Sequence, residues 1–169
     1  SSLPPSPCSA ITSGVAFELS VTPDALVKEL KQGLFLAVDP NTISTGVIST
    51  PATPEAFANL KLQGDVKKQA QGYLNAKPGD DLNLSIDEIA AFQKLGAGAD
   101  VAAVENQLRQ LLAARVEAYR SKGLTGIAPY ARKDGARSPA DELRSASEAS
   151  AGLKTYVPAF YQALLAYPG

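Results

Sequence analysis

The chain has 169 residues, of which 45% are apolar and 20% charged, and its sixteen cationic and seventeen anionic side chains leave a net charge of −1. This length and composition predict one globular domain with a hydrophobic core and exclude a wholly disordered chain. The balanced charge provides no overall field for holding nucleic acid or an acidic membrane. Histidine is absent, which excludes a complete Ser-His-Asp or Cys-His catalytic centre, His-ligated zinc and His-ligated haem.

Residues 1–13 predict a flexible, Pro/Ser-rich tether, because three prolines lie within the first seven residues and proline lacks the N–H that helices and central strands need. The chain opens at Ser1 and contains no methionine, which indicates that an upstream segment was removed. A cleaved export signal and a trimmed recombinant chain both explain this opening. We expect an exported protein, periplasmic or secreted, without a membrane span. Cys8 is the single cysteine, so no internal disulfide can form.

The segment 14–50 predicts a small β element near the front of the domain. Val15–Val21 alternates apolar and polar residues, Leu34–Val38 is a short apolar run, and Thr42–Thr50 is rich in β-branched residues. Two paired strands are the simplest interpretation of these patterns.

Helix signals dominate the rest of the chain. Most of the expected helices begin with a capping residue, a proline in the first position, or both, and Ser85 and Glu88 form a capping-box pattern. The expected helices cover Ala25 to about Gln32, Pro54 to about Leu60, about Asp65 to Leu74, Ser85 to about Leu95, Asp100 to about Ser121, and the chain from Ser138 onward with a restart at Pro158.

Apolar spacing predicts which faces of these helices are buried. The longest helix carries one stripe, formed by Val101, Val104, Leu108, Leu111, Leu112, Val116 and Tyr119. The helix after Ser138 has an expected inner face of Leu143, Ala146, Leu153 and Tyr156. The fold prediction is therefore mainly α (α+β), a helical bundle with a small N-terminal β element, in a single α-rich domain over residues 14–169.

Two short patterns resemble functional motifs but fit ordinary turns better. Counted from Asp81, oxygen-bearing side chains occupy the first, third, fifth and seventh places of a calcium loop, yet Ile86 stands where glycine is needed and Phe92 where glutamate is needed. A turn and a helix cap explain this stretch, so we predict no metal site. Residues 123–126 form a GxxG pattern, which a helix end followed by a turn explains better than a nucleic-acid clamp.

Residues 120–137 carry five cations against one acid, a local excess of four positive charges. One interpretation is a site for a phosphate, a carboxylate or a lipid head group. The other is favourable cations at a helix C-terminus followed by a solvated loop. The candidate ligand-binding residues are Tyr119, Arg120, Tyr130 and Arg132. Aromatic residues also gather near the C-terminus, at Tyr156, Phe160, Tyr161 and Tyr167, and core packing is the default interpretation of such a group.

A series of motifs over residues 50–168 resembles a set of bacterial exported proteins of unknown function. The motifs are Ala76–Asp81 followed by Leu84 and Ile86, Val116–Gly123, Ala140–Leu143 leading to Val157-Pro158, and Leu164–Pro168. The resemblance implies that this chain is the N-terminal part of a longer protein with a strand-rich second half. In that family two cysteines often flank the Pro-Gly-Asp turn, and this chain has Ala76 and Asp81 in those places.

The front section, up to residues 54–57, is also similar to the start of START-type lipid-binding domains. That similarity implies a curved sheet that grips a long helix over an apolar cavity, and it transfers no ligand residue.

We therefore expect a non-catalytic exported domain that binds an apolar small molecule or lipid, a partner protein or a C-terminal half. No cofactor is expected, and no spacing singles out an acid–base pair. The alternative is an enzyme or enzyme subunit whose catalytic groups come from another chain or from a C-terminal half.

Overall fold

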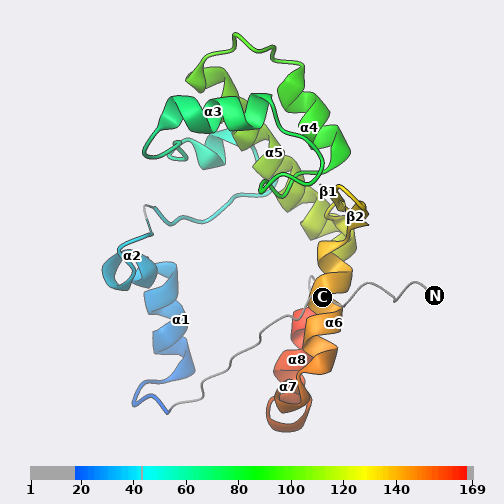
Figure 1. The fold of residues 1–169 in the computed structure, drawn as a ribbon. Coiled ribbons are helices and arrows are strands. Elements are labelled where there is room, and N and C mark those ends of the chain that lie inside the picture. Colours follow the sequence, from blue (N-terminus) through cyan, green and yellow to red (C-terminus); the bar gives the residue numbers. More distant parts are fainter. Residues whose placement is uncertain (1–17, 43, 167–169) are drawn as a thin grey trace, which may run out of the picture.

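The computed structural model describes residues 18–42 and 44–166 (Figure 1). Over these residues the chain is mainly helical, with one two-stranded sheet, which confirms the predicted fold class. The helices are α1 (Pro23–Lys31), α2 (Leu34–Val38), α3 (Val66–Leu74), α4 (Ile86–Gln93), α5 (Val101–Lys122), α6 (Pro139–Ala149), α7 (Ala151–Tyr156) and α8 (Pro158–Ala166). Two 3-10 helices are η1 (Pro54–Phe57) and η2 (Gly123–Gly126), and the strands are β1 (Tyr130–Arg132) and β2 (Gly135–Arg137).

The predicted capping residues begin their helices. The side chains of Thr22, Asp65, Ser85, Asp100 and Ser138 each accept a hydrogen bond from a backbone N–H in the first turn of the helix that follows. The capping box at α4 is complete, because the Glu88 carboxylate also accepts from the backbone N–H of Ser85 at 2.7 Å. The sequence-based helix starts are therefore confirmed at these five positions.

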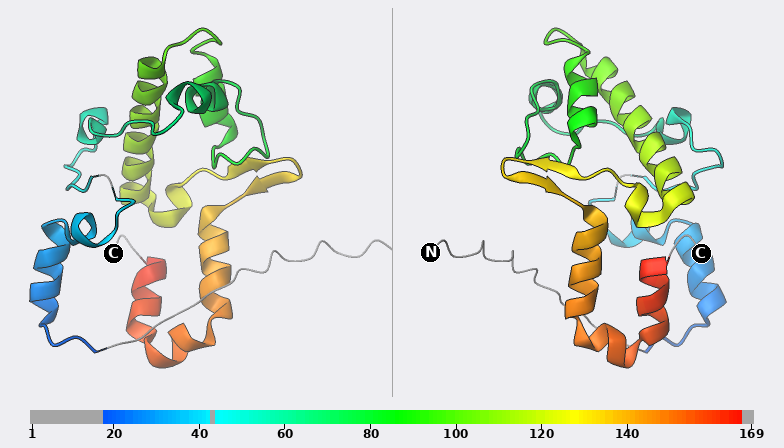
Figure 2. Two further views of the ribbon diagram at one scale, coloured as in Figure 1. Left: turned by 60° about the vertical axis from the view of Figure 1, so that its left-hand side comes forward. Right: turned by 90° about the vertical axis from the view of Figure 1, so that its right-hand side faces the viewer.

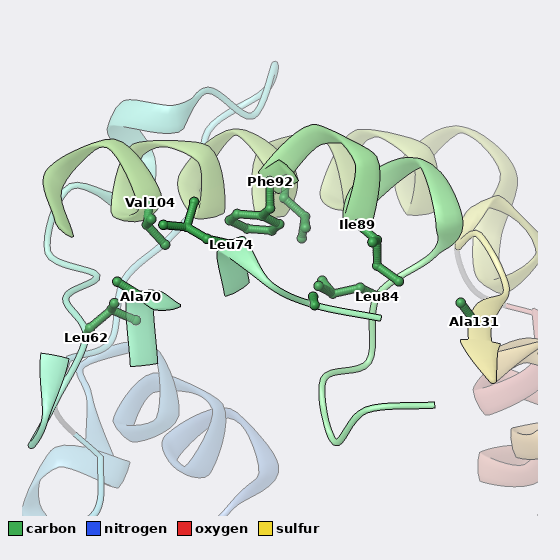
Figure 3. Close-up of a cluster of buried hydrophobic side chains, with 10 residues drawn as sticks. Leu62, Ala70, Leu74, Leu84, Ile89, Phe92, Val104 and Ala131 are labelled. Carbon is green, nitrogen blue, oxygen red and sulfur yellow. The ribbon is translucent and has the colours of Figure 1, made fainter. Parts of the chain in front are cut away.

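The core lies where α3 and α4 pack against α5 (Figure 3). Phe92 and Val104 are completely buried, and the rings of Phe92 and Tyr73 lie 4.9 Å apart between centroids. The buried cluster consists of Leu62, Ala70, Leu74, Ala76, Leu84, Ile89, Phe92, Val104, Leu111 and Ala131. Val104 and Leu111 of the predicted α5 stripe are buried, and Val101, Leu108 and Leu112 pack against them in part.

The small β element is not where the sequence analysis placed it. Leu34–Val38 is helix α2, and the described residues from 18 to 50 contain no strand. A short apolar run has the same pattern in a strand and in a helix, so its composition misled the prediction. Val15–Phe17 and Ile43 lie outside the described residues.

The sheet is instead an antiparallel hairpin of β1 and β2, with Tyr130 opposite Arg137 and Arg132 opposite Gly135. Lys133 and Asp134 form its two-residue turn, and Gly135 follows at the position where glycine is favoured. The sequence analysis treated this segment as a basic loop and missed the hairpin.

The predicted helix from Pro54 to about Leu60 is only the 3-10 turn η1, which packs on α5. Beyond it, residues 60–62 have no regular secondary structure, and α5 side chains make hydrogen bonds with their backbone.

The terminal helices lie outside the core. In Figures 1 and 2, α1 and α2 lie to one side below the α3–α5 core, and α6, α7 and α8 descend on the other side. No residue of α1, α7 or α8 is buried. Tyr156 was expected on the inner face of one helix that continues from Ser138, but it ends the separate short helix α7 and is 83% exposed. None of the helices in the described part of the chain is long and apolar enough to cross a bilayer.

Candidate functional site

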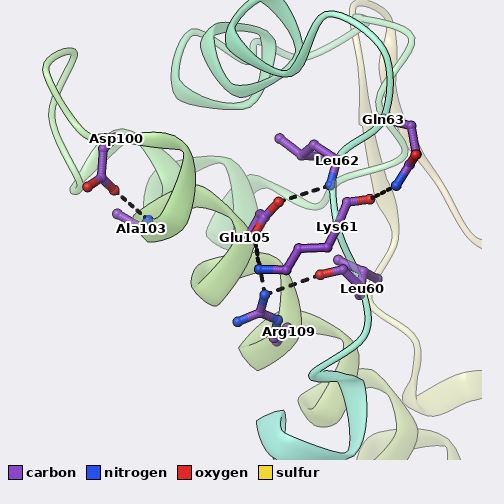
Figure 4. A network of polar contacts seen from close by, with 8 residues as sticks. All are labelled: Leu60, Lys61, Leu62, Gln63, Asp100, Ala103, Glu105 and Arg109. Carbon is purple, nitrogen blue, oxygen red and sulfur yellow. Dashed lines mark hydrogen bonds and ion pairs between the residues drawn. The ribbon is translucent and has the colours of Figure 1, made fainter.

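Three sets of charged side chains on α5 tie other segments to this helix. The first is centred on Glu105, which is only 5% exposed (Figure 4). Its carboxylate accepts hydrogen bonds from Lys61 Nζ at 2.9 Å, from the Leu62 N–H at 3.1 Å and from Arg109 Nη2 at 3.3 Å. Arg109 Nη2 also donates to the Leu60 carbonyl at 3.2 Å. The Lys61 hydrogen bond is the main cause that lowers the pKa of Glu105, against the raising effect of burial.

The second set is Glu117 and Arg120, at the C-terminal end of α5. Arg120 Nη1 and Nη2 donate to the carbonyls of Ser49 and Ile48 at 2.6 and 2.7 Å. Glu117 Oε1 accepts from the Ala52 N–H at 2.7 Å and from Arg120 at 3.1 Å. The Ala52 hydrogen bond is the largest cause of the lowered pKa of Glu117. Together the two side chains fix residues 48–52 against α5.

The third set joins α4 to α5. Arg115 Nε and Nη2 lie 2.7 Å from the two carboxylate oxygens of Glu88, and Nη2 also donates to the Asn83 carbonyl at 2.6 Å. Burial opposes ionisation of Glu88, but hydrogen bonds from Arg115 and the Ser85 N–H outweigh it and lower the pKa of Glu88. The Glu88 hydrogen bond in turn raises the pKa of Arg115.

Tyr130 on β1 extends this third set to the hairpin. The Arg115 guanidinium carbon lies 5.3 Å from the centre of the Tyr130 ring, and that of Arg132 lies 5.9 Å from it, both within cation–π range. Arg132 Nη2 donates to the Asn83 side-chain oxygen. The ring therefore has two guanidinium groups within cation–π range, and both are hydrogen-bonded to Asn83 in the loop before α4.

Backbone hydrogen bonds hold the hairpin against the Pro-Gly-Asp turn and against the loop before α4. The Ala131 N–H donates to the Leu84 carbonyl at 2.8 Å, and the Gly79 N–H donates to the Ala131 carbonyl at 3.2 Å. Gly79 has φ +88°, and a Cβ there would lie 3.0 Å from the Lys133 nitrogen and would overlap its side chain. Glycine is needed at this position both for its backbone conformation and for the close approach of the hairpin.

The four predicted ligand-binding residues fall into two groups. Tyr130 and Arg132 are brought together on β1, whereas Tyr119 and Arg120 lie near the C-terminal end of α5. The guanidinium groups of Arg120 and Arg132 donate hydrogen bonds to oxygens of this chain, in Ser49, Ile48 and Asn83, and Arg132 lies on a strand and not in a solvated loop. Binding of an anion by these residues stays a prediction.

The calcium-like and GxxG stretches are used by the fold. The Asp80 carboxylate accepts from the Lys77 N–H at 2.8 Å, and Ser85 caps α4. In the described ranges, no three His, Cys, Asp or Glu side chains come close enough to share a metal ion. Gly126 lies so near α5 that a Cβ would collide with the Ala118 carbonyl, so η2 is a turn packed on the helix.

The feature that the sequence analysis located only in part is apolar surface on the terminal segments. The large exposed apolar side chains outside the core are Leu19, Val21, Val27, Leu30, Leu36, Val38, Val47, Tyr156, Val157 and Phe160. The C-terminal aromatics were noted, but core packing was their default interpretation. The signal for the N-terminal group was the apolar spacing on the short helix after Thr22.

Two clefts accompany these surfaces. One, of about 380 Å³, lies between α1 and residues 45–47 and is lined by Val27, Leu30, Lys31, Thr45, Gly46 and Val47. The other, of about 250 Å³, lies between α3 and the Pro-Gly-Asp turn and is lined by Gln69, Gly72, Tyr73, Asp80 and Leu82. Burial raises the pKa of Tyr73, and the nearby Arg115 charge partly offsets the effect.

Comparison with models of protein families, with curated proteins and with solved structures found no match. The resemblance to bacterial exported proteins and the similarity to START-type domains therefore stay predictions.

Proposed function

We propose that this chain is a non-catalytic, exported binding domain that holds an apolar partner on the helices outside its core. The observation that carries the proposal is the exposure of α7 and α8. Tyr156 is 83% exposed, Phe160 57% and Val157 45%, and neither helix has a buried residue. The partner is an apolar segment of another polypeptide or a lipid chain.

Exposed aromatic side chains clustered on one element are typical of interaction surfaces. Aromatic residues contribute large apolar contact areas and are enriched among residues that dominate binding energy. Helix α8 adds to this surface because Pro158–Ala166 contains no charged residue, so a partner that covers it desolvates no ion on that helix.

The ionisable side chains support a binding role over a catalytic one. Among the described carboxylates with lowered pKa, Glu88, Glu105 and Glu117 all hold separate segments together. A general acid or base works best with a pKa near the working pH, whereas the pKa values of these three ion-paired carboxylates are lowered. Their positions support a scaffold that keeps the core rigid beside the exposed helices.

Site-specific photo-crosslinking tests the proposal in cells that make the protein. A benzophenone side chain replaces Phe160 in one variant and Gln110 in a control, because Gln110 is exposed on α5 away from the apolar helices. We expect a discrete protein or lipid adduct at position 160 and none at position 110. No adduct at 160, or equal labelling at both positions, would contradict the proposal.

A further inference from the structure

The cleft beside α1 has two walls of defined chemistry. Val27, Leu30 and Lys31 share one face of α1, since residues three and four apart on a helix are neighbours. Residues 45–47 form the opposite wall. The two walls are close, because a Cβ on Gly33, at the end of α1, would lie 3.0 Å from Thr45 Oγ1.

The lining combines three apolar side chains with one charged side chain and one hydroxyl. Val27, Leu30 and Val47 are 46%, 38% and 87% exposed, so each has apolar surface that a ligand would cover. Lys31 is the single charged side chain of the lining, and Thr45 supplies a hydroxyl. No hydrogen bond or ion pair joins the Lys31 ammonium to another described residue. The α1 cleft thus pairs an apolar surface with one uncompensated cation.

We infer that the α1 cleft binds a straight-chain monocarboxylate, with its alkyl chain against Val27, Leu30 and Val47 and its carboxylate on the Lys31 ammonium. The single ammonium of the lining matches the single negative charge of a carboxylate, with which it can form a charge-assisted hydrogen bond. Burial of the alkyl chain supplies the driving force, and the ion pair selects the charged end. This inference rests on the proposed role as an apolar-binding domain but uses a different surface from α7 and α8.

Titration of the full chain with decanoate, followed by amide NMR shifts, tests the inference, with decan-1-ol as the uncharged probe. We expect saturable 1:1 binding of decanoate, with shifts concentrated in residues 26–33 and 44–48. The variant Lys31→Glu should weaken decanoate binding about two- to fivefold, as expected for the loss of an exposed ion pair. It should leave decan-1-ol binding unchanged. Leu30→Asn should weaken both ligands by about tenfold or more, because it removes an apolar wall.

The control variants are Lys67→Glu on α3 and Ile86→Asn on α4, which change an exposed cation and an exposed apolar residue away from the cleft. Neither should alter decanoate binding. Leu30 and Lys31 belong to a helix without buried residues, so their substitution leaves the core intact. Absence of saturable binding, or equal losses in the controls and the cleft variants, would overturn the inference.

Phe160→Asp separates the two proposals. Decanoate binding that is unchanged by Phe160→Asp but lost in Leu30→Asn supports the α1 cleft, even if crosslinking at position 160 fails and the proposed function falls. If decanoate binding is instead lost in Phe160→Asp but kept in Leu30→Asn, the ligand binds on α8. That result overturns the inference about the α1 cleft and supports the proposed function.

Discussion

Arg115 donates hydrogen bonds to both carboxylate oxygens of Glu88, at 2.7 Å each, although the two residues are 27 positions apart in the chain. The same carboxylate closes the capping box of α4, and the same guanidinium contacts the Asn83 carbonyl and the Tyr130 ring. One ion pair therefore links the start of α4, the middle of α5, the loop before α4 and the hairpin.

Substitution Glu88→Gln should destabilise the protein by about 2 kcal/mol, because it leaves the partly buried Arg115 charge without its counter-ion. Urea unfolding at pH 7 measures the change. Asp87→Asn is the matched control, since Asp87 is exposed in the same helical turn, and it should cost less than about 1 kcal/mol. Equal effects of the two substitutions would contradict the assigned role of the pair.

The free energy of unfolding should fall in acid more steeply than it would if all carboxylates kept their ordinary pKa values. The pKa values of Glu88, Glu105 and Glu117 are lowered in the folded chain from an ordinary value of 4.5. A lowered folded-state pKa contributes stability that is fully present above about pH 4.5 and is lost as the pH falls through the folded value. The urea concentration at the unfolding midpoint, measured from pH 7 to pH 3, should therefore decrease once the pH is below 4.5. Glu105→Gln should make that decrease smaller. A midpoint that is constant down to pH 3 would be incompatible with these shifts.

Two glycine substitutions should change stability in opposite directions. Gly79→Ala should destabilise by about 1 to 3 kcal/mol, because φ is +88° and the Cβ meets Lys133. Gly72→Ala should stabilise by about 0.5 to 1 kcal/mol, because Gly72 lies inside α3 and an added Cβ would meet no atom within 4 Å. Thermal unfolding of both variants shows whether each substitution stabilises or destabilises the protein. A stabilising effect of Gly79→Ala would show that the β1–β2 hairpin does not pack closely against the Pro-Gly-Asp turn.

Two phenylalanines distinguish the core from the exposed helices. Phe92→Ala removes a fully buried ring and should cost about 3 to 5 kcal/mol. Phe160→Ala removes a ring that is 57% exposed and should change the unfolding free energy by less than about 0.5 kcal/mol. Urea denaturation measures both, and a loss above about 2 kcal/mol for Phe160→Ala would mean that α8 belongs to the core.

Local signals allowed much of the helical fold to be predicted. Capping at Ser85 and Asp100 fixed the starts of α4 and α5, and the apolar stripe identified Val104 and Leu111 as buried. These signals work because a helix cap and a buried face are both determined by neighbours within a few residues.

The predictions failed where the structure depends on distant partners or on ambiguous runs. The five residues Leu34–Val38 are too short for periodicity to separate helix from strand. The turn signal of Gly135, which is favoured at the last position of a four-residue turn, was present and overlooked among the basic residues. No local pattern reveals that Glu105 reaches Lys61, 44 residues away, or that Arg120 holds the Ile48 carbonyl, so the segments fixed to α5 could not be predicted.

Hydrogen exchange followed by mass spectrometry tests most directly whether the terminal helices lie outside the core. Amides of α3, α4 and α5 should exchange only through global unfolding, while those of α1, α7 and α8 should exchange orders of magnitude faster by local opening. A bound apolar partner should slow the terminal helices alone. Protection of α7 and α8 equal to that of α5 in the isolated chain would contradict the account.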